Sequence, residues 1–274
     1  KLLQIAGVDN PHEYVSNTAE HLPAPTRDAR RNFNQWKLIE DPFESRSANG
    51  LVMYRVGKAK HENDRRISRA KCYDLESLAE DEIQYIKEFV LLRHPEICMR
   101  LEGHPNFPKY FDCGFSNRNL FWVIDKWEDG IKLTEAVSNG ALALLDVPRI
   151  AKEIASGLAS LHENGVIRRE LTPEFVMLRD NGQSVMLLDF ELAKIVGGVT
   201  SRPMEWSRSP FLAPELDSPN VDFRADMFSW AQIVVYMLTE KKPPSPVDVK
   251  ILQSLAIPKK IFSVSPVPKP YLAR

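Results

Sequence analysis

The sequence predicts an α+β protein with two lobes, a small antiparallel sheet followed by a mostly helical lobe. Two observations lead to this prediction. Between residues 36 and 127, short segments rich in β-branched and aromatic residues alternate with polar turns, as is typical of strands. From residue 147 onward, apolar residues recur at helical spacing or form a long apolar run, as is typical of packed helices. The boundary between the lobes is expected near residues 127–130.

The first lobe is expected to contain five strands and one helix. The segment "SLAEDEIQYIKEFVLLRHPEICMRLEGHPN" places Ile83, Ile86 and Val90 on a helical stripe, and Pro95 should break or redirect that helix. Residues 1–35 are polar and rich in turn residues, which indicates an extension or a linker. The expected strands are residues 36–41, 50–59, 66–75, 107–115 and 119–127.

The second lobe is expected to be built on two long helices. The segment "VPRIAKEIASGLASLHENGV" carries apolar residues on one face, and "RADMFSWAQIVVYMLTEKKPP" is apolar nearly all round, which predicts a buried helix. Short strands are expected at residues 175–178 and 184–190. The proline-rich end of the chain predicts that part of the helical lobe is missing or replaced. We therefore divide the chain into an extension (1–35), a first lobe (36–128), a second lobe (129–244) and a divergent C-terminal segment (245–274).

The composition is that of an ordinary soluble globular protein, with 43% apolar and 27% charged residues among 274. The net charge of −1 favours neither nucleic acid nor an anionic membrane as a partner. Three scattered cysteines argue against a disulfide framework and against a zinc site. Because the sequence shows no long apolar run and no signal peptide, we expect a cytoplasmic protein, and this chain as part of a longer one.

Four short motifs follow one another in the second lobe. They are "RRELTPEF" (168–175) after the first long helix, "DFE" (189–191) after a strand, "APE" (213–215), and "DMFSWA" (226–231) at the start of the buried helix. Their order and spacing resemble the eukaryotic-type protein kinase domain, which has H-R-D-L-x-x-x-N, D-F-G and A-P-E at these places and an aspartate at the start of its buried helix. The resemblance covers residues 36–244 and implies the two-lobed kinase fold, with ATP bound between the lobes.

The resemblance implies a role for residues of both lobes. Glu170 stands for the catalytic aspartate, Arg169 for the arginine before it, and Asp189 for the main Mg²⁺ ligand. Lys71 stands for the strand lysine that contacts the ATP phosphates. The other positions implied to contact the nucleotide are Gly50 and Val52 at the phosphate loop, Ile124 behind the adenine pocket, and Asp125 and Trp127 in the hinge between the lobes.

Several positions carry side chains that fit phosphoryl transfer poorly. The phosphate loop "PFESRSANGLV" holds one glycine where the family has three, so an ordinary hairpin turn is expected there. Glu170 lengthens the catalytic carboxylate by one methylene, and a displacement near 1 Å can cost about 10²-fold in rate. Phe175 replaces an asparagine that holds Mg²⁺, and Glu191 replaces the glycine after Asp-Phe, so Asp189 is expected to be at most a weak metal site.

Arg69 is the most informative departure from the family pattern. Because strand residues alternate between faces, Arg69 and Lys71 point the same way, toward the place where the family usually has alanine in the adenine pocket. Burying an unpaired guanidinium is costly. Either Arg69 pairs with an acid such as Asp189 and fills the cleft, which excludes ATP, or the register of this strand differs. The helix partner of Lys71 is left open among His94, Glu96 and Glu88.

These departures together predict a pseudokinase, a regulatory or protein-binding domain with little or no phosphoryl transfer. Bound ATP is expected to be absent or weak, with Mg²⁺ only where ATP binds. The expected partner is another protein or a neighbouring domain of the same chain, and no membrane is involved. Nucleic acid is not expected, because the basic residues Arg65, Arg66 and Arg69 have no aromatic residues interleaved. The alternative is an active, divergent serine/threonine kinase with a minimal catalytic set of Lys71, Glu170 and Asp189.

Overall fold

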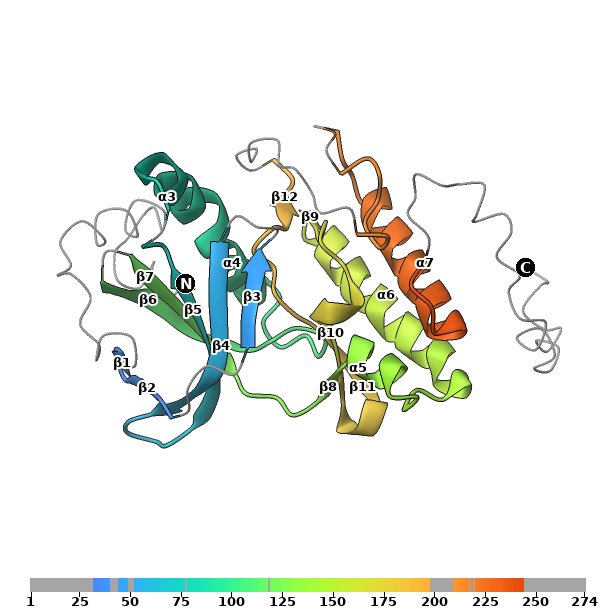
Figure 1. The fold of residues 1–274 in the computed structure, drawn as a ribbon, viewed down its shortest axis with the longest axis horizontal. Coiled ribbons are helices and arrows are strands. Elements are labelled where there is room, and N and C mark those ends of the chain that lie inside the picture. The colour runs from blue at the N-terminus through green and yellow to red at the C-terminus, as the bar shows by residue number, and fades with distance from the viewer. Residues whose placement is uncertain are drawn as a thin grey trace, which may run out of the picture.

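The computed structural model has two lobes, with a curved sheet and its helices in one and a helical bundle in the other (Figure 1). It describes residues 32–39, 44–48, 52–76, 78–117, 119–197, 209–216, 218 and 220–243. Most of the expected extension and the expected C-terminal segment lie outside the described residues, so the predictions made for them stay predictions.

Strands β4 to β7, which are four of the five strands predicted for the first lobe, form an antiparallel sheet, and β3 pairs with β4. Strand β4 lies next to β5, and β7 lies between β5 and β6. The short strands β1 and β2 continue the sheet, because β2 pairs with one end of β4 while β3 pairs with the other. The strands are β1 (Asn32–Phe33), β2 (Trp36–Leu38), β3 (Glu44–Ala48), β4 (Val52–His61), β5 (Ile67–Asp74), β6 (Tyr110–Asn117) and β7 (Leu120–Lys126).

The start of the sheet differs from the prediction in two ways. The strand expected over residues 36–41 is the three-residue β2, and its partner β1 lies inside the segment expected to be an extension. Residues 44–48, expected to lie in a turn, form β3 in register with the first residues of β4. A sequence with weak strand preference forms a strand here because a partner strand satisfies its backbone.

The two faces of the sheet bury different apolar clusters. One face carries Ala59, Ala70 and Ile124, which pack with Trp36 and Phe33 of the β1–β2 hairpin. The opposite face packs against α3 (Glu80–Ile86), a π-helical turn (Lys87–Leu91) and α4 (Arg93–Arg100). Since successive strand residues point to opposite faces, the register of each strand decides which side chains reach the space between the lobes.

Pro95 lies where the helix of the first lobe is redirected, as predicted. It belongs to the first turn of α4, where backbone N–H groups have no partner inside the helix, so a residue without an N–H is tolerated. A π-helical turn separates this helix from α3. The neighbouring His94 is fully buried on α4.

Helices α6 and α7 lie side by side in opposite directions and form the centre of the second lobe (Figure 1). The predicted apolar stripe of α6, with Ile154 and Leu158 in its middle, is buried. Trp230 of α7 donates its indole N–H to the carbonyl oxygen of Ala151 at 2.9 Å. The elements are α5 (Leu133–Ser138), α6 (Val147–Glu163), α7 (Arg224–Thr239), the 3-10 turns Leu144–Asp146, Pro173–Phe175 and Asp180–Gly182, and the strands β8 (Ile131–Lys132), β9 (Val166–Ile167), β10 (Val176–Arg179), β11 (Ser184–Leu187) and β12 (Lys194–Ile195).

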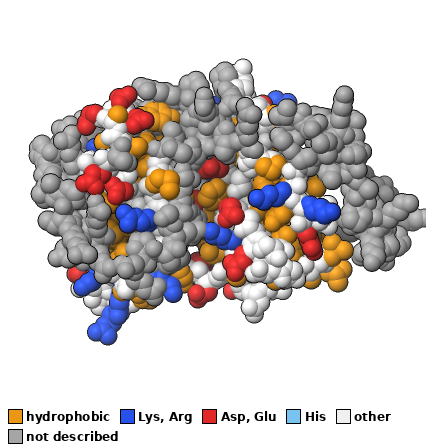
Figure 2. Space-filling view, in the orientation of Figure 1, with side chains coloured by type: hydrophobic (Ala, Val, Ile, Leu, Met, Phe, Trp, Pro, Cys, Tyr) orange, Lys and Arg blue, Asp and Glu red, His pale blue; other side chains and the backbone are white. Residues whose placement is uncertain are grey.

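Helix α7 buries one face, whereas its sequence predicted burial nearly all round. Among the described residues, Met227 on its other face is 43% exposed. Acidic, basic and apolar side chains are mixed over the described part of the surface in Figure 2, without one sign of charge covering it. Across the described ranges, no helix has both the length and the apolar character that crossing a bilayer requires.

Asp226 at the start of α7 holds the loop that carries the "RRE" motif. Its carboxylate is fully buried and accepts the backbone N–H groups of Arg168 at 2.7 Å and Arg169 at 2.8 Å. His162 of α6 lies 2.9 Å from the same carboxylate. These contacts stabilise the left-handed backbone of Arg169, whose φ is +61°.

Replacing Asp226 with asparagine should lower the free energy of unfolding by about 3 kcal/mol, because the new amide N–H₂ faces backbone donors in a buried site. Denaturant unfolding measures this loss. Asp222→Asn is the matched control, since Asp222 is exposed and pairs only with the nearby Arg224 in the described structure. A loss for Asp226→Asn no larger than for Asp222→Asn contradicts the role given to the buried carboxylate.

Candidate functional site

Strand β5 carries two buried cations into the space between the lobes. Arg69 and Lys71 lie on the same face, opposite Asp125 and Val123 of β7. Arg69 is 7% exposed and Lys71 is fully buried. Burial lowers the pKa of Lys71 to about 8, although the nearby Asp189 opposes this shift. Buried cations need acidic partners, because their solvation by water has been lost.

The segment after β11 supplies these acidic partners. Asp189 and Glu191 are buried, and Asp189 has a left-handed backbone with a φ of +56°. The guanidinium Nη2 of Arg69 donates to Asp189 Oδ1 at 2.5 Å, and Nζ of Lys71 lies 2.9 Å from the same oxygen. Glu191 forms a further ion pair with Lys71. The pairing of Arg69 with Asp189, one of the two alternatives from the sequence, is therefore confirmed.

Two tyrosines complete the hydrogen bonds of these acids. The hydroxyl of Tyr54 donates to Asp189 Oδ2 at 3.0 Å, and that of Tyr73 donates to Glu191. Neither tyrosine was predicted from the sequence as part of the site. Tyr73 could have been predicted, because it lies two positions after Lys71 on β5 and therefore points to the same face.

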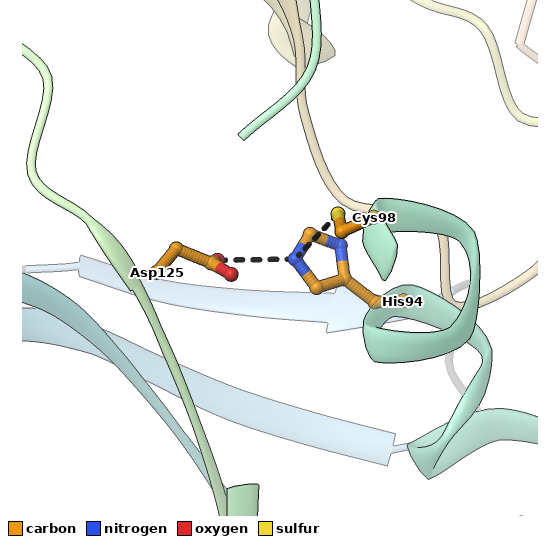
Figure 3. A group of neighbouring side chains, drawn as sticks. All are labelled: His94, Cys98 and Asp125. Carbon is orange, nitrogen blue, oxygen red and sulfur yellow. Dashed lines mark hydrogen bonds and ion pairs between the residues drawn. The ribbon is translucent and has the colours of Figure 1, made fainter. Parts of the chain in front are cut away.

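His94 connects α4 with the hinge end of β7 (Figure 3). Its Nε2 lies 3.0 Å from Asp125 Oδ2, and its Nδ1 accepts the backbone N–H of Phe190 at 3.2 Å. A ring nitrogen that accepts carries no proton, so the neutral ring holds its proton on Nε2 and donates it to Asp125. Burial lowers the pKa of His94, in agreement with a neutral ring. His94 is thus the partner of Asp125, and the first of the three alternatives left open as the helix partner of Lys71 is wrong.

The second helix candidate for Lys71 is also wrong. Glu96 lies toward the surface, where it pairs with Arg100 at 2.6 Å. The side chain of the third candidate, Glu88, lies outside the described residues. Glu191, which replaces the glycine after Asp-Phe, pairs with Lys71 directly. Lys71 therefore has an acidic partner that does not come from a helix.

His94, Cys98 and Asp125 are a candidate set of ligands for a zinc ion. Their ligand atoms lie within 4.8 Å of one another in the buried interior (Figure 3). Coordination through Nε2 requires the ring proton on Nδ1, yet Nδ1 accepts the backbone N–H of Phe190. Burial also raises the pKa of Cys98, which disfavours the thiolate that zinc binds. The three side chains therefore fit a hydrogen-bonded core group better than a metal centre.

Asp189 does not fit the Mg²⁺ of a kinase either. Arg69 and Lys71 occupy its Oδ1, and Tyr54 occupies its Oδ2. Mg²⁺ needs a near-octahedral set of oxygen ligands and binds carboxylates that are free to join it. Phe175, at the position of the second metal ligand, contributes a ring instead, as predicted. The predicted metal role of Asp189 would require this set of contacts to be broken first.

A cavity of about 290 Å³ remains between the lobes beside the hinge. Arg69 lines it, whereas Lys71 and Asp189 do not, so the guanidinium separates the cavity from the buried acids. The hinge residue Trp127 lines it, and its contact with a nucleotide stays a prediction. The other lining residues are Val56, Pro108, Lys126, Glu128, Asp129, Gly130, Lys132, Glu135, Met177, Met186 and Leu188.

Two residues predicted to contact the nucleotide lie elsewhere. Ile124 packs on the opposite face of the sheet with the β1–β2 hairpin, and Asp125 takes the position facing the cleft, because a shift of one residue reverses the face. Val52 packs in the cluster under α3, and Val56, four residues closer to the hinge along β4, lines the cavity instead. Gly50 lies outside the described residues.

The loop with the "RRE" motif packs tightly under the Asp-Phe-Glu segment. Arg168 is fully buried between the rings of Phe175 and Phe190, with its guanidinium carbon 5.5 and 5.0 Å from their centroids. Its Nη2 donates to the carbonyl oxygen of Leu188 at 2.7 Å. Phe175 is therefore a packing residue, as predicted.

Arg169 and Glu170 are also buried in this loop. Arg169 donates its Nε–H to the carbonyl oxygen of Leu192 at 2.6 Å, which ties it to the segment after Asp-Phe-Glu. Burial raises the pKa of Glu170 to about 7; the charge of Asp189 adds to this shift, while Arg168 and Arg169 oppose it. The position that corresponds to the catalytic aspartate thus holds a carboxyl group that keeps its proton to a higher pH than an ordinary glutamate does.

The fold and the motifs define a protein kinase-like chain, and comparison with known proteins agrees. The model of the protein kinase domain family matches residues 53–269, so the chain belongs to this family. It is 27% identical to a probable myosin light chain kinase of Dictyostelium discoideum over 57% of the chain and 51% of that protein. It is 29% identical to serine/threonine-protein kinase shk1/pak1 of Schizosaccharomyces pombe over 58% of the chain and 24% of that protein. Serine/threonine-protein kinase D of Synechocystis is 27% identical over 52% of the chain and 29% of its own length. The chain thus spans about half or less of these relatives.

Glu170 should make stability fall as the pH rises through neutrality. Its pKa is about 7 in the folded protein and about 4.5 unperturbed, so between these values the folded state binds more protons than the unfolded state, and ionisation favours unfolding. Replacing Glu170 with glutamine removes this dependence. We expect the variant to gain about 3 kcal/mol in unfolding free energy relative to the native protein between pH 5 and 8. Denaturant unfolding at several pH values measures the difference, and a difference independent of pH contradicts the raised pKa.

Proposed function

We propose that this chain is a pseudokinase domain, with little or no phosphoryl transfer and a role in regulation through protein binding. The observation that carries the proposal is the buried ion pair between Arg69 and Asp189. In this ion pair, the Arg69 side chain contacts the carboxylate that a kinase uses to bind Mg²⁺. A nucleotide with its metal could bind only after this ion pair separates, and leaving one partner of a buried pair uncompensated costs about 3–5 kcal/mol.

The charges around the cleft support the same proposal. Three buried carboxylates, from Asp125, Asp189 and Glu191, lie close to two buried cations, from Arg69 and Lys71. The cations are already engaged by acids of the chain, so a triphosphate without its metal would meet additional negative charge. ATP is therefore expected to bind weakly or not at all, with Mg²⁺ only where it does.

The loop with the "RRE" motif supports a loss of phosphoryl-transfer activity. Glu170 has a raised pKa of about 7, and it replaces a shorter aspartate at the position that orients a substrate hydroxyl. Phe175 stands at the position where the family has the asparagine that binds the second metal ion, and its ring packs against Arg168 instead. Positioning and electrostatics supply most of the catalysis in phosphoryl transfer, and both are altered here.

The partner of such a domain is proposed to be another protein or a neighbouring domain of a longer chain. Exposed apolar side chains support a binding role, among them Leu145 at 79% and Met53 at 55% exposure. The relatives are longer than the matched region, which is compatible with neighbouring domains. Neither nucleic acid nor a membrane is proposed as a partner.

The second candidate is an active, divergent serine/threonine kinase. The observation that favours it is the pair of Lys71 and Asp189, which keeps two family residues 2.9 Å apart in the cleft. Several relatives carry the name of serine/threonine kinases. Rearrangement of Arg69 and Glu191 would have to precede catalysis in this candidate.

Thermal melting with ATP distinguishes the two candidates. The native protein should show no Mg²⁺-dependent rise in Tm at millimolar ATP, whereas a ligand at 100 times its Kd stabilises by about 2.7 kcal/mol, a shift of several degrees. A Mg²⁺-dependent shift, together with phosphate transfer that disappears in Glu170→Ala, establishes the active kinase instead.

A gain-of-binding variant tests the cause of this loss. Arg69→Ala with Glu191→Gly restores the side chains that the family has at these two positions and removes one cation and one acid together. The double variant should gain a Mg²⁺-dependent rise in Tm with ATP that the native protein lacks. Circular dichroism checks that it folds, and a folded variant without the shift contradicts the ion pair as the barrier to the nucleotide.

A further inference from the structure

One end of the sheet in the first lobe carries cations that face one another across the strands. Lys37 of β2 lies directly opposite Lys60 of β4, and Lys58 of β4 lies directly opposite Arg69 of β5. Residues opposite each other in an antiparallel pair point to the same face, and so do residues two positions apart on one strand. The four side chains therefore share one face of the sheet, which we call the cation face.

Three of these cations have no acid beside them in the part of the chain that the structure describes. No described carboxylate lies within ion-pair distance of Lys37, Lys58 or Lys60. Asp64 of the adjoining turn pairs with Arg66 at 2.6 Å instead. Like charges directly opposite each other destabilise a sheet. An anionic group bound across Lys37 and Lys60 would remove this cost.

The cation face continues into the cavity beside the hinge. Val56 lies two positions before Lys58 on β4, and Val56 and Arg69 both line that cavity. Nζ of Lys58 lies 4.6 Å from the ring centroid of Trp127, which lines the cavity as well. A ligand on the cation face can therefore reach into the cavity without separating Arg69 from Asp189.

The cavity itself suits an uncharged apolar group. Its charged lining residues are three cations and three acids, so their formal charges cancel: Arg69, Lys126 and Lys132 against Glu128, Asp129 and Glu135. Nζ of Lys126 lies 2.7 Å from Glu128, and Asp129 accepts the indole N–H of the hinge tryptophan at 2.9 Å. The apolar lining comes from Val56, Pro108, Met177, Met186 and Leu188. A volume of about 290 Å³ has room for one large apolar or aromatic side chain.

The spacing of the cations matches an extended acidic segment. Lys58 and Lys60 are two residues apart on a strand, which is about 6.7 Å, and alternate side chains of an extended peptide have the same spacing. Ile67, which lies opposite Lys60 and is 38% exposed, adds an apolar contact on this face. Single-stranded nucleic acid fits less well, because its bases stack on aromatic rings, and the ring of Trp127 is already in contact with Lys58.

We infer that the cation face and the adjoining cavity together bind an acidic, extended segment of a protein partner. The acidic side chains of this segment pair with Lys37, Lys58 and Lys60, and an apolar or aromatic side chain that follows them occupies the cavity. The inference rests on the proposed function and deepens it, because it names the chemistry of the partner and the surface that binds it.

Fluorescence anisotropy with a synthetic peptide tests this binding on the native protein without nucleotide. The probe is a fluorescein-labelled peptide in which three glutamates alternate with glycines and precede one phenylalanine. It should bind about tenfold more tightly than the same peptide with glutamine in place of glutamate, as three ion pairs at a surface allow. Replacing its phenylalanine with glycine should also weaken binding about tenfold, because the burial of an aromatic ring is lost. Equal affinities for the glutamate and glutamine peptides overturn the inference, and equal affinities with and without phenylalanine overturn the role of the cavity.

Charge reversal identifies the surface. Lys37→Glu with Lys60→Glu should weaken binding of the glutamate peptide about tenfold and strengthen binding of a peptide with lysine in place of glutamate. Lys241→Glu with Lys242→Glu, at exposed positions after α7, changes the net charge equally and should leave both affinities unchanged. Circular dichroism checks that each variant folds, and the peptide comparison on the native protein decides where one does not. An effect at the cation face no larger than in the control overturns the inference. A single-stranded oligothymidylate that binds more tightly than the glutamate peptide, and no longer binds after the same reversal, overturns it in favour of nucleic acid.

This inference and the proposed function fail separately. Loss of the difference between the glutamate and glutamine peptides, with no Mg²⁺-dependent rise in Tm with ATP, removes the docking surface and leaves the pseudokinase. A Mg²⁺-dependent rise in Tm with ATP, together with charge-dependent peptide binding, removes the pseudokinase and leaves the docking surface.

Discussion

The ion pair between Arg69 and Asp189 is the contact on which the rest of the site depends. It joins the sheet of the first lobe to a segment of the second, and both partners are buried. A buried pair contributes little stability compared with an apolar pair of the same shape, but either partner alone is strongly destabilising. The neighbouring side chains must therefore keep both charges in place. Tyr54 and Lys71 do so at Asp189, and Asp125 does so at Arg69.

Contacts around this pair continue through the protein in both directions. Phe190, next to Asp189, donates its backbone N–H to His94 on α4, and its ring lies against Arg168. The backbone N–H of Arg168 in turn binds Asp226 at the start of α7. The sheet, α4, the "RRE" loop and the helical lobe are thus connected by buried polar contacts. In a region of low dielectric constant such contacts are strong when satisfied and costly when one is removed.

The sequence predicted most of the fold because its signals are local. Strand and helix periodicity predicted β4 to β7, α6 and α7, and the alternation within β5 correctly placed Arg69 and Lys71 on one face. The same reasoning failed on β7, where "LFWVI" is apolar on both faces, so the pattern does not show whether Ile124 or Asp125 faces the cleft. Strand β3 was missed because its hairpin partner, rather than its own preference, makes it a strand. The partner of Lys71 depends on the backbone of Asp189 and Glu191, which no local pattern reports.

The departures from the kinase pattern are not independent losses. Arg69 in the cleft needs an acid, Asp189 is the acid it takes, and Lys71, which shares that oxygen, gains Glu191 as a second partner. At the hinge end, Asp125 Oδ2 lies 3.5 Å from Arg69 Nη1 and 3.0 Å from the protonated Nε2 of His94. Each substitution is costly alone, because it leaves a buried charge without a partner, and tolerable in the presence of the others. Energies of residues that share partners in this way do not add. Treating each departure as a separate penalty therefore misstates the cause, because in the described structure the acids and cations of the cleft are partners of one another. Under the proposed pseudokinase function, a change at one of these residues should leave the other charges paired, and only coordinated changes should free the cleft for a nucleotide.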